Sequence, residues 1–191
     1  EYVLPVDVLE SSDNKQILIK ASTLNDIISK MRSDDITLTF NDQYQAHIES
    51  SQIKFDIFGL NSSEYPDFPV IERDLTFSVK SDILLKLIKH TIFSVSYDET
   101  KQFLNGIKIE SNNNCCDFIS TDGFRLSIQN QQFDTDIPEF SCIVPFKTMN
   151  ELSKILVQLK SESIEVHLSE KQISFKLGHC TVISRLINGR F

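Results

Sequence analysis

Apolar and polar residues alternate along most of this chain. The clearest alternation runs through residues 36–40, 164–168 and 173–177, where every second side chain is apolar. Because successive side chains of a strand point to opposite faces, a period of two places the apolar residues on one buried face. These runs therefore predict half-buried β-strands, and we expect most of the chain to be β.

Three stretches depart from this alternation and repeat apolar residues at intervals of three or four. They are Leu24–Met31, Leu84–Ile92 and Met149–Leu159. That spacing gathers apolar side chains on one side of a helix, so it predicts three amphipathic helices. Ser81 and Asp82 are expected to open the second helix, and Thr148 with Glu151 has the pattern of a capping box before the third.

Turn-forming residues separate the predicted strands. They are Asn41-Asp42, Gly59, residues 61–63, residues 112–114 and Gly178. Pro66 and Pro69 mark the expected linker, near residues 61–74, because proline and its neighbours favour extended or turn conformations.

The region around the first predicted helix is repeated around the third. Ile19–Ile27 aligns with Val144–Leu152, residues 36–40 align with residues 164–168, and Phe55-x-Ile57-x-x-Leu60 aligns with Thr181-x-Ile183-x-x-Leu186. The offset stays at about 126 residues, far longer than the unit of a solenoid repeat, which predicts duplicated domains.

The two copies differ in what precedes them. A predicted helix and several strands, in residues 75–125, come before the second copy, whereas almost nothing comes before Val3 in the first. We therefore expect the first domain to be truncated, and Phe191 to be an equally abrupt end.

Charge is distributed unevenly between the predicted helices and the rest of the chain. The net charge is −8, which by itself argues against binding to nucleic acid. Residues 20–32, 80–93 and 147–160, however, hold nine Lys or Arg against three acidic residues, so the remainder carries −14. Lysines on one helix are often only solvated, but three basic helices favour a ring with a positive lining that contacts DNA phosphates without reading sequence.

Several classes of protein lack support in the sequence. The longest apolar runs are far shorter than the roughly 20 residues of a bilayer span, so we expect no membrane segment.

The four cysteines show no CxxC spacing, which favours reduced thiols and a cytoplasmic location over a zinc site or disulfides. Scattered histidines (His47, His90, His167 and His179), and the absence of HExxH, GxSxG and Gly-rich phosphate motifs, argue against an enzyme. Two acidic pairs, Asp98-Glu99 and Asp134 with Asp136, could suggest metal or carboxylate chemistry. We expect them instead to lie in solvated loops.

Five segments, in order along nearly the whole chain, resemble one known family. They are Ser63–Pro69 (SEYPDFP), Phe93–Ile107 (FSVSYDETKQFLNGI), Ser120–Ser127 (STDGFRLS), Ile143–Thr148 (IVPFKT) and Ser184–Phe191 (SRLINGRF). Together they resemble the bacterial DNA sliding clamp, the beta subunit of the replicative DNA polymerase. The resemblance implies an α+β fold of duplicated clamp domains, with antiparallel sheets on the outside and amphipathic helices on the inner, DNA-facing side.

The resemblance also implies a function and partners. The family encircles double-stranded DNA independently of sequence, works as a homodimer ring without catalysis, cofactor or metal, and binds the replicative polymerase catalytic subunit, the clamp loader and other clamp-binding proteins. By this resemblance, residues 1–70 are the C-terminal half of clamp domain one and residues 71–191 are clamp domain two. The start of domain one and all of domain three are expected to be missing.

Three sets of site residues follow from the same resemblance. The partner-peptide cleft takes Leu104, Thr121, Gly123, Phe124, Arg125 and Leu126 on its domain-two side. The DNA-facing set is Lys30, Arg32, Lys86, Lys89, Lys101, Gln102, Phe103, Lys147 and Lys154. The dimer interface takes Phe55 and Ile57. Phe124 departs from the histidine of many members, which changes the expected shape of the cleft.

One alternative of a different class stays open at this point. A scaffold of duplicated domains that binds proteins but no DNA would have the same fold and composition. Binding to duplex DNA that falls steeply with salt separates the two hypotheses, because phosphate contacts release counterions.

Overall fold

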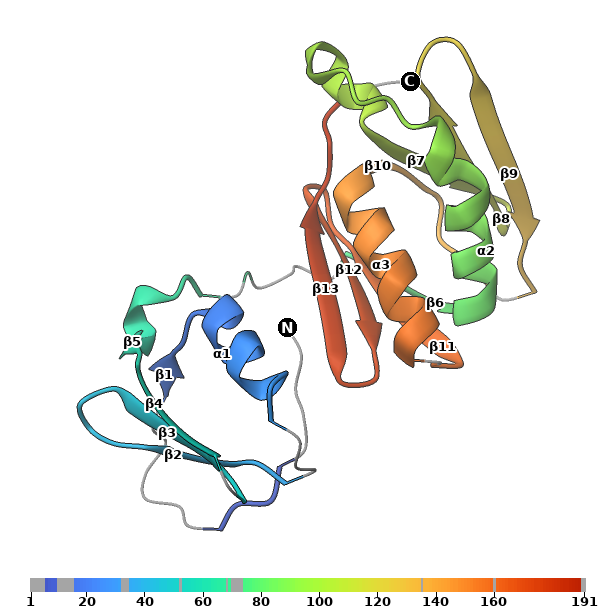
Figure 1. The fold of residues 1–191 in the computed structure, drawn as a ribbon. Helices are drawn as coiled ribbons and strands as arrows, with labels where there is room; N and C mark the ends of the chain where they lie inside the picture. The colour runs from blue at the N-terminus through green and yellow to red at the C-terminus, as the bar shows by residue number, and fades with distance from the viewer. Residues whose placement is uncertain are drawn as a thin grey trace. The chain divides into compact units, whose positions relative to one another are not determined.

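The computed structural model describes residues 6–9, 16–31, 35–51, 53–67, 69, 74–134, 136–159 and 161–189. The chain divides into two compact units on either side of the junction between residues 68 and 69. We call residues 6–68 the N-terminal unit and residues 69–191 the C-terminal unit. Each is described by itself (Figure 1).

The N-terminal unit combines one helix with short antiparallel strands. Its elements are β1 (Ile17–Leu18), α1 (Ala21–Ile28), β2 (Thr37–Phe40), β3 (Gln45–Ser50), β4 (Ile53–Phe58), β5 (Leu60–Asn61) and the 3-10 turn η1 (Ser62–Glu64). Strands β2, β3 and β4 form one sheet, and β1 pairs with β5. Ile27, Met31 and Ile48 form its small core, since α1 turns its apolar side toward the central strand β3.

The C-terminal unit has two helices and two four-stranded sheets. Its elements are β6 (Leu75–Lys80), α2 (Ser81–Thr91), η2 (Ile92–Ser94), η3 (Glu99–Leu104), β7 (Gly106–Asn112), β8 (Cys115–Thr121), β9 (Leu126–Gln132), β10 (Phe140–Pro145), α3 (Phe146–Leu159), β11 (Ser163–Leu168), β12 (Gln172–Leu177) and β13 (Cys180–Arg185). The sheet orders are β10-β7-β8-β9 and β13-β12-β11-β6, with every pair antiparallel. This arrangement confirms the predicted α+β class with antiparallel sheets.

One hydrophobic core joins both sheets to both helices. α2 and α3 lie side by side (Figure 1) and bury their apolar faces against the strands. Leu87, Met149 and Leu152 are at most 1% exposed, as are Ile107 on β7 and Phe175 on β12. Because the apolar side of each helix is used in this way, its polar side is left facing away from the sheets.

The repeat found in the sequence is visible in the order of the elements. β1-α1-β2-β3-β4 in the N-terminal unit matches β10-α3-β11-β12-β13 in the C-terminal unit, and the pairing of β1 with β5 is matched by a bond from Ile187 N to the carbonyl of Ile143. Within the C-terminal unit the same strand-helix-three-strand order also occurs twice, since β6-α2-β7-β8-β9 precedes it.

Of the two predicted helix starts, that of α3 is wrong and that of α2 is confirmed. α3 begins at Phe146, so Thr148 lies inside the helix and its hydroxyl pairs with that of Ser184 at 2.7 Å instead of capping the helix. A tertiary partner thus takes the oxygen that the capping box needs. α2 begins at Ser81 as predicted, and Asp82 Oδ1 accepts from Ile83 N at 2.8 Å in its first turn. Its N-cap residue, Lys80, makes no side-chain capping bond.

One predicted half-buried strand is more exposed than its pattern indicates. All four residues of β2 are exposed, with Leu38 at 44% and Phe40 at 40%. β2 is an edge strand of a three-stranded sheet, so the small core beneath it covers less of its apolar face.

The turn predicted at residues 112–114 lies between β7 and β8. Asn113 and Asn114 both adopt positive φ there, which asparagine tolerates and which a tight hairpin requires.

Candidate nucleic-acid interface and partner cleft

The exposed side of α2 carries two lysines. Lys86 and Lys89 are exposed three positions apart, while Leu84, Leu87 and Ile88 on the other side are buried. Asp82 is the acidic residue of the first turn, where it complements the positive end of the helix dipole. The lysines therefore form a short basic stripe opposite the core.

The neighbouring helix α3 repeats this arrangement. Lys147 and Lys154 are exposed seven positions apart, and the buried residues Met149 and Leu152 lie opposite. Lys154 Nζ lies 2.8 Å from Glu151 Oε1, so part of its charge is compensated. In the N-terminal unit, Lys30 is exposed just beyond the end of α1, whereas Arg32 lies outside the described residues.

The segment Glu99–Leu104 is anchored beside the first turn of α3. Phe146 N donates to the carbonyl of Asn105 at 2.9 Å, and the rings of Tyr97 and Phe146 pack edge to face with centroids 5.1 Å apart. These contacts bring the predicted loop residues close to Lys147. Lys101, Gln102 and Phe103 are all exposed within it.

A capping bond fixes the start of this segment. Asp98 accepts from the hydroxyl of Thr100 at 2.7 Å and from its backbone N–H at 2.9 Å. These bonds, the hydroxyl first, lower the pKa of Asp98 from its ordinary value. The carboxylate therefore stays charged and keeps the turn closed.

The predicted cleft residues cluster at the turn between β8 and β9. Asp122 Oδ1 accepts from the N–H groups of Phe124 and Arg125 at 2.9 and 3.0 Å, and Asp122 Oδ2 accepts from Arg125 Nε at 2.9 Å. Thr121 donates its hydroxyl hydrogen to the carbonyl of Arg125 and accepts from Gly123 N. Gly123 has φ +89°, a conformation that favours glycine.

Asp122 holds this turn and its arginine together. The backbone bonds from Phe124 and Arg125 are the main cause that lowers the pKa of Asp122, with the Arg125 guanidinium adding to it. The sequence prediction missed this residue, although an aspartate ahead of a glycine turn is a known turn signal. Thr121, predicted to contact a bound peptide, uses its hydroxyl within the turn.

The apolar residues of the predicted cleft differ strongly in exposure. Phe124 is 99% exposed and Leu126 is 61% exposed, so both offer free apolar surface. Leu104 is only 8% exposed. Leu104 precedes β7 by two residues and Thr121 ends β8, so these antiparallel strands place both residues at the same end of the sheet.

Phe55 and Ile57 lie on β4, an edge strand of the N-terminal sheet. They share one face of the strand, where Phe55 is 36% exposed and Ile57 packs against the small core. Phe58, on the opposite face, is 78% exposed. The edge leaves a row of backbone groups without a neighbouring strand in the described sheet.

Two models of known protein families match this chain. The family model of the DNA polymerase III beta subunit, central domain, matches residues 78–191, and that of the N-terminal domain matches residues 3–69. The chain belongs to the DNA polymerase III beta subunit family. The first match alone covers more than half of the sequence.

Relatives of the beta subunit family support this assignment. Proteins named "Beta sliding clamp" from Halalkalibacterium halodurans and Staphylococcus aureus are each 30% identical, over 96% and 97% of this chain. The crystal structure of the DNA polymerase sliding clamp from Bacillus subtilis superposes with a TM-score of 0.86 at 27% identity, covering 95% of this chain. The chain spans 49% of each of the two relatives and 50% of that structure.

Two further features bear on this beta subunit chain. No described helix combines the length and hydropathy needed to cross a bilayer. Within the described ranges, His, Cys, Asp and Glu side chains form no group of three or more that is placed to hold a metal ion.

Proposed function

We propose that this chain is part of a DNA sliding clamp, a processivity factor that encircles double-stranded DNA and tethers the replicative polymerase without catalysing a reaction. The observation that carries the proposal is the lysine stripe on the exposed sides of α2 and α3, in a chain of the beta subunit family. Lys86, Lys89 and Lys147 have no ion-pair partner among the described residues.

The chemistry of these helices suits binding without sequence recognition. A lysine ammonium on a flexible stem meets a phosphate as a point charge and releases counterions, but it reads no base edge. The acidic remainder of the chain repels DNA from the other surfaces. Duplex DNA is therefore attracted to the helices and stays free to slide along them.

The other features of the proposed ring are those expected for a member of this family. Residues 1–70 would be the second half of clamp domain one and residues 71–191 clamp domain two, with helices on the inner side and sheets on the outer side of a homodimer ring. The β4 edge with Phe55 and Ile57 would join the third domain of the second subunit, because an open strand edge can pair with another chain. This ring would act in the cytoplasm.

The turn between β8 and β9 would form the domain-two side of the partner cleft. Phe124 and Leu126 provide exposed apolar walls, and the Asp122 carboxylate orients Arg125 toward a polar group of the bound peptide. The replicative polymerase catalytic subunit, the clamp loader and other clamp-binding proteins would compete for this cleft with short hydrophobic segments.

The salt dependence of duplex binding tests the clamp against a protein scaffold that binds no DNA. We expect the affinity for a fluorescent duplex, measured by anisotropy, to fall linearly with salt on logarithmic axes, with a slope of about −0.9 for each phosphate contacted. The slope should not depend on base sequence. Binding that is absent, or insensitive to salt, contradicts the proposal and favours the scaffold.

The cleft is tested by Arg125→Ala in a protein where the complete cleft is present. We expect about a tenfold loss of affinity for a partner peptide, because a charge-assisted hydrogen bond is removed. Calorimetric titration with the peptide measures the effect. Arg185→Ala, at an exposed arginine on β13, is the matched control and should bind like the parent. Equal affinity of Arg125→Ala and the parent would show that the assignment of the cleft is wrong.

A further inference from the structure

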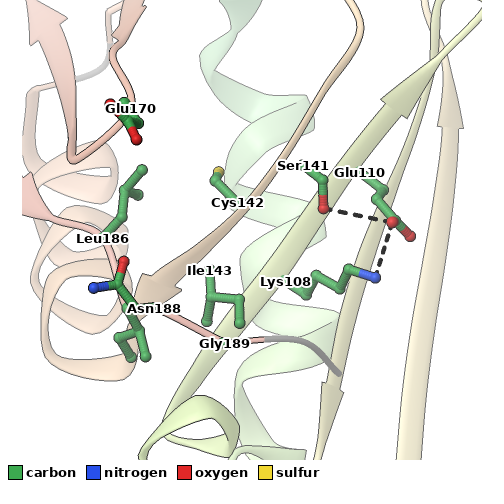
Figure 2. Close-up of a pocket in the computed structure, with 10 residues that line it drawn as sticks. Lys108, Glu110, Ser141, Cys142, Ile143, Glu170, Leu186, Asn188 and Gly189 are labelled. Atoms are coloured by element: carbon green, nitrogen blue, oxygen red, sulfur yellow. Dashed lines mark hydrogen bonds and ion pairs between the residues drawn. The ribbon is translucent and has the colours of Figure 1, made fainter.

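A pocket of about 350 Å³ lies in the C-terminal unit between β10 and the residues that follow β13 (Figure 2). We call it the β10 pocket and define it by Glu110, Ser141, Cys142, Ile143, Glu170 and Leu186. It shares no residue with the helix lysines or with the turn between β8 and β9.

The middle of the β10 pocket is apolar. Ile143 is 4% exposed, and Leu186 packs against the main core. The side chain of Cys142, the neighbour of Ile143 on β10, points to the opposite face of the strand and belongs to that core. Such a floor suits the hydrocarbon part of a ligand.

Carboxylates stand on both sides of this floor. Figure 2 shows Glu170 and Leu186 on one side and Lys108, Glu110 and Ser141 on the other. Glu110 Oε1 is 2.8 Å from Lys108 Nζ and also accepts from the Ser141 hydroxyl at 3.4 Å. Glu170 has no ion-pair partner among the described residues, so its negative charge is the one left uncompensated.

The wall formed by β10 is also an open strand edge. Ile187 N donates to the Ile143 carbonyl at 2.9 Å, so the backbone groups of Ile143 point away from β7. Backbone direction alternates along an antiparallel strand, which turns the N–H and C=O of Ser141 toward the same edge. β10 is the outermost strand of its sheet and Ser141 is exposed. An extended peptide can pair with β10 at this residue.

The domain repeat places a second hollow at the matching position of the N-terminal unit. This pocket of about 270 Å³ is lined by Ile17, Asp42 and Asn61 among others. By the repeat, these residues match Ile143, Glu170 and Ile187 of the β10 pocket. Strand β1 pairs only with β5 among the described strands, so this second pocket lacks the wall that β7 supplies through Lys108 and Glu110.

We propose that the β10 pocket binds an extended segment of a partner protein that carries a lysine or arginine. The segment pairs with the backbone of Ser141, the stem of its basic side chain lies over Ile143 and Leu186, and its cationic end meets Glu170. The charge of −14 outside the three basic helices favours a positively charged partner. This site is independent of the proposed DNA binding and of the proposed cleft.

The probe for this site is the N-acetylated, C-amidated pentapeptide Thr-Val-Arg-Val-Thr, titrated into the ¹⁵N-labelled 191-residue chain. We expect saturable shifts of the backbone amides of Ser141, Ile143 and Asn188. Glu170→Gln should weaken binding about three- to fivefold, as the loss of an exposed ion pair does. Asp42→Asn, the matched change in the second pocket, should leave the affinity unchanged.

A second peptide, with norleucine in place of arginine, isolates the charge and should bind about three- to fivefold more weakly to the parent chain. Because Glu170 is exposed in a turn, the spectrum of Glu170→Gln away from the pocket should match that of the parent. The proposal is overturned by an absence of saturable shifts, by shifts confined to α2 and α3, by equal losses in Glu170→Gln and Asp42→Asn, or by equal affinity for the two peptides.

Discussion

A single side chain, that of Asp122, fixes the conformation of the turn between β8 and β9. Asp122 satisfies two backbone N–H groups and one guanidinium N–H, so the loop is held by one carboxylate. The motif around Gly123 was visible in the sequence, but the role of Asp122 was not, because it depends on the backbone path of the turn. The exposed position of Phe124 likewise follows from that path.

The four cysteines provide a test at the same scale. Cys142 is buried and its raised pKa, about 12, leaves only about one thiolate in ten thousand at pH 8, whereas Cys115 is partly exposed. We expect iodoacetamide to modify Cys115 first in the native protein, as read by peptide mass spectrometry.

The pH dependence of Cys142 has a definite sign. A raised thiol pKa means that reactivity increases as the pH rises toward 12, and that it is low at neutral pH. Unfolding the protein should remove the difference between the two cysteines. Modification of Cys142 as fast as Cys115 in the folded chain would contradict the burial described for it.

At the scale of elements, the periodicity of the sequence was sufficient to predict the three helices but not to predict the residues at which they begin and end. Apolar spacing identified α1, α2 and α3, since each helix must bury one stripe against a sheet. The cap at Thr148 failed because Ser184, a residue distant in the sequence, takes its hydroxyl. The exposure of β2 also escaped prediction, because it depends on how many strands and helices cover an edge.

Two positions of α3 show how much its buried face contributes to stability. Leu152 is fully buried between the sheets and α2, so Leu152→Ala should reduce the free energy of unfolding by about 2–5 kcal/mol. Val157, on the same helix, is 53% exposed, and Val157→Ala should cost less than about 1 kcal/mol. Urea denaturation followed by circular dichroism measures both. Similar losses in the two variants would mean that α3 does not pack as described.

At the scale of the whole molecule, the repeat of about 126 residues was the most informative sequence feature. It indicated duplicated domains, and the five family segments indicated which domains they are. The uneven charge pointed to the proposed function, since an acidic chain of net charge −8 concentrates lysine on helices whose polar sides are exposed. Which surfaces would close the proposed ring was not predictable, because local patterns do not encode contacts with other domains or subunits.

The clamp proposal depends on where the positive charge lies rather than on how much there is. The triple variant Lys86→Glu, Lys89→Glu, Lys147→Glu reverses the helix stripe. The variant Lys171→Glu, Lys176→Glu, Arg185→Glu makes the same change in net charge at exposed positions on β12 and β13 and just before β12. Comparing the two separates the helix face from overall charge.

The decisive measurement is the affinity of these two variants and the parent for one short DNA duplex at low salt. We predict that reversing the helix lysines weakens binding about a hundredfold, because several phosphate contacts are lost and replaced by repulsion, while the matched variant loses far less. Equal losses in the two variants, or no loss when the helix lysines are reversed, would contradict the placement of DNA against α2 and α3.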